Sequence, residues 1–198
     1  KRKLKKFEAD RRMGQITISL DDSGFAKADC VLEAVVENLD IKKRVLKELA
    51  EITSSDTILC TNTSALSVTE IAQATKDPSR VVGFHFFNPV HRMPLVEIIK
   101  TEFTSPKTLA SSFHLARRLE KTPILVKDSC GFLINRILLS YVNEAGRLLE
   151  EGARVEWLDK IITDFGMPMG PLRLSDEVGL YIGSKVLHLL EESFGERF

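Results

Sequence analysis

Short apolar runs alternate with amphipathic segments from residue 26 to residue 127. Apolar runs of this length, bounded by turn residues, are typical of buried β-strands. We expect such strands at residues 30–36, 57–61, 81–87, 95–99 and 123–126. Helical spacing of apolar residues lies between them, at 41–52 and 109–119, and Ser67 and Glu70 form a capping box that begins a short helix. Strands separated by helices indicate βαβ units, so this pattern predicts an α/β fold with a parallel sheet.

Beyond residue 127 the apolar positions keep a helical period, and no strand pattern follows. A first stripe begins with Phe132 and ends at Gly152, and a second ends at Gly166, where glycine is typical of a helix C-terminus. Gly170-Pro171 indicates a loop, and we expect a third helix over about 178–192. The chain therefore predicts two domains without a flexible linker, an α/β domain over residues 1–126 and an all-helical domain over 127–198.

The composition, the hydropathy and the cysteine spacing argue against several classes of protein. The chain carries 28 basic and 28 acidic side chains, and this balance excludes a nucleic-acid-binding protein that works by bulk charge. No stretch is long and apolar enough for a transmembrane helix. The three cysteines are far apart and no His or Cys pair has zinc spacing, so we expect free thiols, a reducing compartment and no metal site.

The most informative stretch ends the third expected strand. His85 lies there among aromatic residues, and Asn88-Pro89 then forces a turn. Ligands of open α/β sheets gather at the carboxyl ends of strands. Glu97 lies in the next strand, which is otherwise aliphatic, so its carboxylate needs a partner. We expect a dyad in which Glu97 fixes the tautomer of His85 and raises its basicity.

Four motifs in order resemble one family. They are Asn62-Thr63-Ser64, GFHFFNP at 83–89, PLVEII at 94–99 and GFLINR at 131–136. Together they resemble the L-3-hydroxyacyl-CoA dehydrogenase family, and GMPMGP at 166–171 is similar to its C-terminal domain. The version here resembles the dehydrogenase region of the multifunctional fatty-acid β-oxidation α subunit. The resemblance implies a Rossmann-like domain followed by a helical domain, and NAD-dependent oxidation of L-3-hydroxyacyl-CoA to 3-ketoacyl-CoA.

The resemblance also implies roles for individual residues. His85 would take the proton from the substrate hydroxyl, and Glu97 would orient His85. Ser64 and Asn135 would bind the acyl-CoA substrate. The cofactor NAD would be bound by Glu37, Lys42, Asn62 and Asn88. No metal is required, because the cofactor accepts the hydride.

Each of these residues also has a purely structural interpretation. His85 fits a satisfied core histidine, and Glu97 fits a charge that protects an edge strand. Ser64 fits a turn before the capping box, and Asn135 fits a local helix cap. Glu37 and Lys42 fit ordinary surface charges.

One expected motif is missing. A dinucleotide-binding domain normally begins with strand, G-x-G-x-x-G and helix, and none of the eleven glycines has that spacing. The chain opens without Met in a charged, helix-like segment, whose basic residues fit either a phosphate-binding patch or a solvated helix face. We therefore expect a piece of a longer chain, truncated at both ends, whose phosphate loop precedes Lys1.

Two other functions stay open at this point. Without a phosphate loop, the chain fits a non-catalytic fragment that acts as an assembly module. A dehydrogenase of a 3-hydroxy acid without CoA would use the same scaffold.

The resemblance also bears on partners and location. Three helices rarely bury all their apolar stripes alone, so we expect a homodimer or contact with a second helical repeat, and in the parent complex a thiolase subunit. Localisation is expected to be cytoplasmic in a bacterium, and mitochondrial or peroxisomal in a eukaryote.

Overall fold

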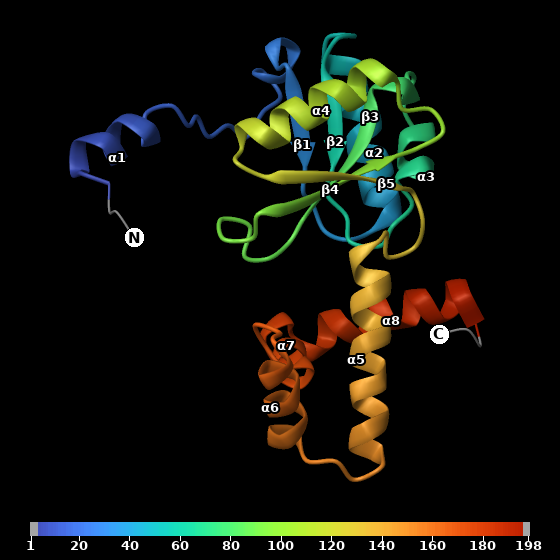
Figure 1. Ribbon diagram of the computed structural model, residues 1–198. Coiled ribbons are helices and arrows are strands. Elements are labelled where there is room, and N and C mark those ends of the chain that lie inside the picture. Colours follow the sequence, from blue (N-terminus) through green and yellow to red (C-terminus); the bar gives the residue numbers. More distant parts are fainter. Residues whose placement is uncertain (1–3, 196–198) are drawn as a thin grey trace.

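The computed structural model describes residues 4–195, without the side chains of Tyr181, Ile182 and Lys185. A mixed sheet with helices on both faces forms the first part of the fold, and a group of helices extends from one edge of it (Figure 1). The prediction of an α/β domain followed by a helical domain is confirmed.

The sheet has five strands in the order β1-β2-β3-β4-β5. They are β1 (Cys30–Glu33), β2 (Ile58–Thr61), β3 (Val81–Phe86), β4 (Leu95–Lys100) and β5 (Thr122–Lys127). All neighbouring pairs are parallel except β3 and β4, which are antiparallel. The prediction of a wholly parallel sheet is therefore wrong at this pair. Only a turn with a cis Asn88-Pro89 bond joins the two strands, so the chain reverses direction without a crossover helix.

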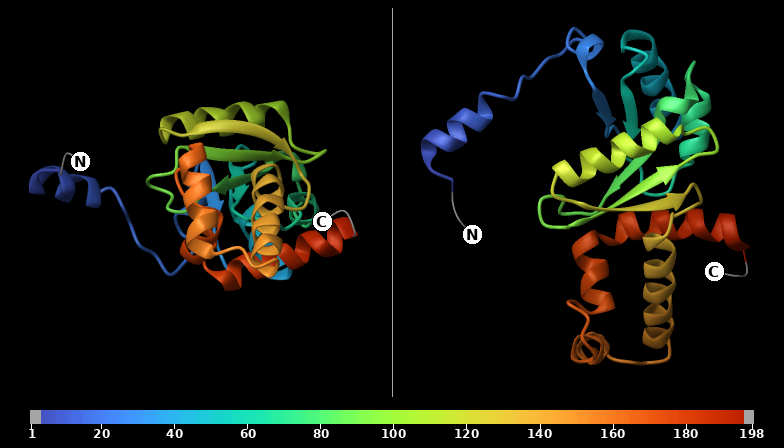
Figure 2. Two further views of the ribbon diagram at one scale, coloured as in Figure 1. Left: turned by 60° about the horizontal axis from the view of Figure 1, so that its bottom comes forward. Right: turned by 45° about the horizontal axis from the view of Figure 1, so that its top comes forward.

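Helices cover both faces of the sheet. On one face lie α2 (Leu39–Ile52) and α3 (Val68–Gln73), and on the other lies α4 (Pro106–Arg118), as Figure 2 shows. Short 3-10 helices precede β1 (η1, Phe25–Lys27) and β3 (η2, Pro78–Arg80). Side-chain oxygens of Asn38, Ser67 and Ser105 accept hydrogen bonds from the first turns of α2, α3 and α4. The expected cap at Ser67 is thus present.

Alternation along the strands divides the core between the two faces. Leu59 and Val81 pack with α2 and α3, whereas their neighbours Cys60 and Val82 pack with α4. A third group, made by Val68, Ile99, Val126 and Phe132, joins the sheet to the start of the helical part.

A separate helix, α1 (Lys6–Met13), lies away from the sheet at the end of an irregular segment (Figure 1). It contains no buried residue. The basic opening of the chain falls partly on residues 1–3, which lie outside the described residues.

Between residues 127 and 195 the C-terminal part has four helices, not the expected three. They are α5 (Ile134–Glu150), α6 (Val155–Phe165), α7 (Pro171–Val178) and α8 (Leu180–Phe194). The left-handed Gly166 ends α6 as expected. The loop expected at Gly170-Pro171 is instead the start of α7, because Pro fits the first helical position and the Asp159 carboxylate accepts from the amides of Leu172 and Arg173.

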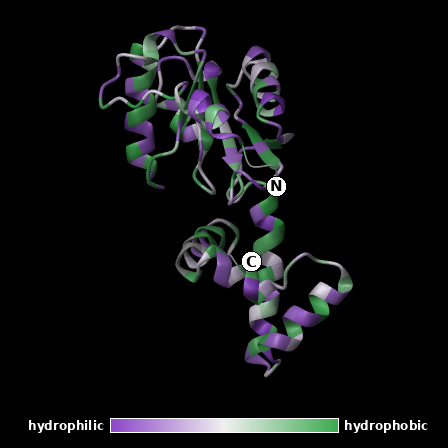
Figure 3. Cartoon of the chain, turned by 90° about the vertical axis from the view of Figure 1, so that its left-hand side faces the viewer, coloured by the Kyte–Doolittle hydropathy of each residue, from purple (hydrophilic) through white to green (hydrophobic). Residues whose placement is uncertain are grey.

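The last helix begins later than expected. Val178 ends α7, and Gly179, at a φ of +93°, separates it from α8. Hydrophilic and hydrophobic residues are interspersed along these helices (Figure 3). Several of the large apolar side chains are exposed. Trp157 and Phe165 of α6 are 59% and 85% exposed. None of the helices in residues 4–195 has the length and apolar character to cross a membrane.

Candidate active site

His85 and Glu97 form the centre of a buried polar site. The antiparallel register of β3 and β4 places the two residues directly opposite each other. Their side chains therefore lie on the same face of the sheet, and His85 Nδ1 is 2.7 Å from Glu97 Oε2. Both side chains are buried, at 5% and 0% exposure. The structure thus brings together the two residues that the sequence paired.

The second oxygen of Glu97 belongs to the helical part. Glu97 Oε1 accepts hydrogen bonds of 3.0 Å from the backbone amides of Leu133 and Ile134, at the start of α5. The first amides of a helix have no intrahelical partner, and a negative charge is favourable there. One carboxylate therefore holds an imidazole with one oxygen and a helix N-terminus with the other.

These contacts define the tautomer of His85. A carboxylate only accepts hydrogen bonds, so Nδ1 of the imidazole donates to it and Nε2 is left with its lone pair. No hydrogen bond to Nε2 is formed within residues 4–195. The site thus offers one unprotonated nitrogen, which suits a general base.

Aromatic rings enclose the imidazole. The ring of Phe87 lies 4.7 Å from that of His85, and the ring of Phe132 lies 5.6 Å away, centre to centre. Phe132 was expected on a helical stripe, but it precedes α5 in a turn with a φ of +50°. A left-handed Phe is uncommon and is held there by its surroundings, here the packing beside His85 and the Glu97 bond to the next amide.

Ser64 and Asn135 meet between the two parts of the fold. Asn135, in the first turn of α5, donates from Nδ2 to the backbone oxygen of Ser64 at 3.0 Å. The interpretation of Asn135 as a local helix cap is therefore replaced by a contact between domains. The Ser64 hydroxyl is half-buried, and within the described chain it forms no hydrogen bond.

A buried ion pair supports the ends of β1 and β2. Lys42 is fully buried, and its Nζ lies 2.8 Å from Glu33 Oε1 and 2.8 Å from the backbone oxygen of Asn62. Glu37 lies farther away, at 3.6 Å, and keeps 42% of its side chain exposed. Lys42 is therefore not a surface charge.

Glu37 and Asn62 each bind a neighbouring strand end. Glu37 Oε1 accepts from the Thr63 hydroxyl at 2.6 Å and from the Ser64 amide at 2.8 Å. Asn62 Oδ1 accepts from the Phe86 amide at 3.3 Å. The carboxyl ends of β1, β2 and β3 are thus joined into one polar rim.

Two residues of this rim, Glu33 and Thr63, were missed from the sequence. Glu33 also accepts from the Thr61 hydroxyl at 2.6 Å and is 3% exposed. It is a charged residue in an apolar strand, which is the signal that identified Glu97, and the same reasoning applied to 30–36 would have found it. Thr63 had no signal beyond its place in the strand-end motif.

Asn88 is the one expected residue that stands apart. It lies exposed in the turn after β3, at the cis bond to Pro89, and forms no hydrogen bond to the other site residues within the described part. Among residues 4–195 no group of three His, Cys, Asp or Glu side chains is placed to hold a metal ion.

The comparisons with known proteins agree along the whole chain. A family model described as 3-hydroxyacyl-CoA dehydrogenase, NAD binding domain, matches residues 1–129, and one described as the C-terminal domain of the same enzymes matches residues 131–198.

Solved structures give the same result. FadB2 of M. tuberculosis is 38% identical with a TM-score of 0.93, over 98% of this chain and 69% of that one. The (S)-3-hydroxybutyryl-CoA dehydrogenase PaaH1 of Ralstonia eutropha is 37% identical with a TM-score of 0.93 and the same coverage. The dehydrogenase part of multifunctional enzyme 1 of C. elegans is 32% identical with a TM-score of 0.68, over 97% of this chain and 44% of that one.

Proposed function

Because the chain belongs to the 3-hydroxyacyl-CoA dehydrogenase family of NAD-dependent oxidoreductases, we propose that it oxidises an L-3-hydroxyacyl-CoA to the 3-ketoacyl-CoA in fatty acid β-oxidation. The observation that carries the proposal is the buried contact of 2.7 Å between His85 Nδ1 and Glu97 Oε2, which leaves Nε2 free for a proton. NAD, when bound, accepts the hydride from C3 of the substrate.

His85 acts as the general base in this reaction. Loss of hydride from C3 turns the carbinol into a carbonyl, and the hydroxyl proton must leave at the same time. Nε2 takes that proton, since Nδ1 is already held by Glu97. A positioned base contributes about 100- to 10,000-fold to the rate of such a step.

Glu97 orients the imidazole and stabilises its charged form. Proton transfer converts His85 into an imidazolium next to a buried carboxylate, so the charge is compensated where it forms. The carboxylate is itself held by the amides of Leu133 and Ile134, so little reorganisation is required.

Ser64 and Asn135 bind the substrate in this proposal. The Ser64 hydroxyl has a donor and acceptors available and lies next to the strand ends. Asn135 fixes the Ser64 backbone from the other domain, so a substrate between the two parts meets both residues.

The cofactor residues divide into two kinds. Glu37 has an exposed carboxylate that can accept from the hydroxyl groups of a ribose, and Asn62 provides an amide group on the same rim. Asn88 would offer its amide group from the turn after β3. Lys42 is enclosed by Glu33 and by the carbonyl of Asn62, so it acts by holding the rim in place.

Names of similar structures support the substrate class. PaaH1 and an enzyme of Escherichia coli are called 3-hydroxybutyryl-CoA dehydrogenases, and the E. coli structure is 36% identical with a TM-score of 0.92. This chain covers 69% of the first and 41% of the second. The thioester of coenzyme A is therefore favoured over a free 3-hydroxy acid.

A cofactor and substrate assay tests the proposal. Binding is measured from the change in NADH fluorescence on titration with this chain. Turnover is measured as NADH formation from NAD, with either L-3-hydroxybutyryl-CoA or free 3-hydroxybutyrate as substrate. We expect turnover of the CoA ester and not of the free acid, and saturable NADH binding would contradict the interpretation of the chain as a non-catalytic fragment. Turnover of the free acid would favour the CoA-independent enzyme, and absence of binding up to millimolar NADH would favour the non-catalytic assembly module.

We propose a second copy of the chain as the partner of the helical part. Large apolar side chains are exposed on α6 and at the start of α8, among them Trp157, Phe165 and Leu180. Exposed apolar surface of this kind is typical of protein–protein interfaces. Sedimentation at several concentrations is expected to show a dimer, and Trp157→Lys is expected to shift it toward monomer. If a thiolase subunit is a partner, it is expected to co-sediment with this chain when the two proteins are mixed.

A further inference from the structure

Two cysteines on neighbouring strands lie in contact. Cys30 begins β1 and Cys60 lies in β2, and their Sγ atoms are 3.5 Å apart. In the parallel register Cys60 is paired with Leu32, two residues from Cys30, so both thiols point to the same face of the sheet. The two cysteines are 30 residues apart in the sequence, so local patterns do not predict their contact.

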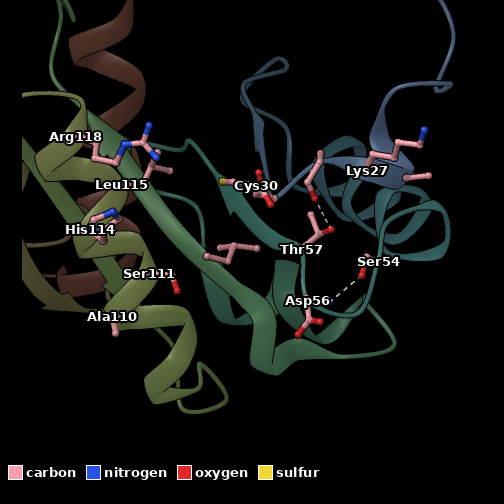
Figure 4. Close-up of a pocket in the computed structure, with 14 residues that line it drawn as sticks. Lys27, Cys30, Ser54, Asp56, Thr57, Ala110, Ser111, His114, Leu115 and Arg118 are labelled. Carbon is pink, nitrogen blue, oxygen red and sulfur yellow. Dashed lines mark hydrogen bonds between the residues drawn. The ribbon is translucent and has the colours of Figure 1, made fainter.

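An open cavity gives access to one of the two thiols. Cys30 is half-buried and lines a cavity of about 770 Å³ between α4 and the start of β1. Figure 4 shows Ser111 and His114 of α4 on one side of this cavity and Thr57 on the other. Cys60 is only 1% exposed and lies in the core. A small polar reagent can therefore reach Cys30 first.

The contact makes the two sulfurs unequal. The hydrogen bond from Cys60 lowers the pKa of the Cys30 thiol, against the opposing effects of burial and of Asp29. The pKa of the Cys60 thiol is raised well above its usual range, first by this hydrogen bond and then by burial. Cys30 is thus the better thiolate, and thiolates are the nucleophilic form of cysteine.

We propose that Cys30 and Cys60 are an oxidisable thiol pair, which a peroxide converts into a disulfide between β1 and β2. The Cys30 sulfur attacks one peroxide oxygen, the O–O bond breaks, and Cys30 becomes a sulfenic acid while water leaves. The Cys60 sulfur then attacks the Cys30 sulfur, the S–O bond breaks, and the proton of Cys60 leaves with the hydroxyl as water. The two thiols together give two electrons, which reduce one peroxide to two waters.

Disulfide formation requires a backbone shift as well as side-chain rotation. A disulfide has its sulfurs about 2.05 Å apart and its Cα atoms about 4.4–6.8 Å apart. The two sulfurs are 3.5 Å apart here, and the diagonal position of Cys60 relative to Cys30 corresponds to a Cα separation of about 7–8 Å, so β1 and β2 must move closer at this point. Cys30 lies at the amino end of β1, away from the site at the carboxyl ends of the strands, whereas Cys60 lies two residues before Asn62 of the polar rim. The thiol chemistry itself uses none of the residues proposed to bind NAD or acyl-CoA.

Peptide mapping tests the thiol pair directly. The reduced chain is treated with hydrogen peroxide, the remaining thiols are alkylated, and the digest is analysed by mass spectrometry without reduction. We expect loss of two of the three free thiols and a linked peptide containing Cys30 and Cys60, lighter by two hydrogens. Cys130, whose Sγ donates to the backbone oxygen of Leu189, is the internal control and stays alkylated.

Two variants separate the roles of the sulfurs. In Cys30→Ser, a substitution at a half-buried position, Cys60 is expected to stay reduced. In Cys60→Ala, Cys30 is expected to accumulate as a sulfenic acid that dimedone traps. Cys130→Ser is expected to leave the linked peptide unchanged. The proposal is overturned if the linked peptide is absent at peroxide concentrations that oxidise Cys130, or if cross-links join two chains instead.

Discussion

His85 and Glu97 face each other across β3 and β4 because these two strands are antiparallel within an otherwise parallel sheet. After a crossover helix, β4 would begin beside the amino end of β3. Because the chain instead turns directly after β3, at the cis Asn88-Pro89 bond, β4 begins beside the carboxyl end of β3, and Glu97 lies 2.7 Å from the imidazole. The one departure from the expected topology thus creates the central contact of the site.

Replacing the imidazole is expected to abolish most turnover. In His85→Gln no ring nitrogen accepts the hydroxyl proton, so the rate of 3-hydroxyacyl-CoA oxidation should fall about 100- to 10,000-fold. NADH formation measures this loss. His188→Gln is the matched control, since this side chain is 71% exposed on α8. Near-normal turnover in His85→Gln would remove the residue from its proposed role.

Glu97→Gln tests whether the carboxylate positions both the imidazole and α5. The amide loses the negative charge that faces the imidazolium and the helix N-terminus, so turnover should fall at least tenfold. The amides of Leu133 and Ile134 should also exchange faster with deuterium, which a role in proton transfer alone would not cause. Glu102→Gln, at an exposed position beyond β4, is the control for both measurements. Unchanged exchange would show that Glu97 does not hold α5.

Removing the buried lysine is expected to destabilise the fold. Lys42→Met leaves Glu33 as a buried charge without its cation, and such a change costs about 3–5 kcal/mol in the free energy of unfolding. Urea denaturation measures it. Lys43→Met removes the neighbouring, partly exposed pair with Glu70 and should cost less than about 1 kcal/mol. Equal losses in the two variants would contradict the distinction between the buried and the exposed pair.

Alanine substitutions at two glycines are expected to change the free energy of unfolding in opposite directions. A Cβ at Gly83 would lie 2.7 Å from the Cβ of Ile99 and 2.9 Å from Val68, so Gly83→Ala should lower the free energy of unfolding by about 1–3 kcal/mol through overpacking. Gly146 lies inside α5, and a Cβ added there would have no atom within 4 Å. Gly146→Ala should therefore raise the free energy of unfolding by up to about 1 kcal/mol, because alanine has the higher helix propensity. Thermal unfolding compares them. A rise in Tm for Gly83→Ala would show that β3 and β4 are loosely packed there.

Local patterns predicted much of the fold. All five strands, the cap at Ser67 and the helix end at Gly166 follow from residues close together in the sequence. The direction of β4 did not, because it depends on how the chain turns after Asn88. The start of α7 was missed for a similar reason, since its capping carboxylate, Asp159, lies on a different helix.

The candidate site shows the same division between local and distant information. His85 and Glu97 were identified because polar residues in apolar strands need partners. The contact of Asn135 with Ser64 spans 71 residues and that of Cys30 with Cys60 spans 30, and both depend on tertiary packing alone. Glu33 was within reach of the reasoning used for Glu97, because it also interrupts an apolar strand.

The two oxygens of Glu97 connect the junction of the two parts to the imidazole. A displacement of the helical part from the sheet would break the bonds to Leu133 and Ile134, and so would loosen the side chain that holds the ring of His85. The orientation of the imidazole is therefore coupled to the packing of the two parts against each other.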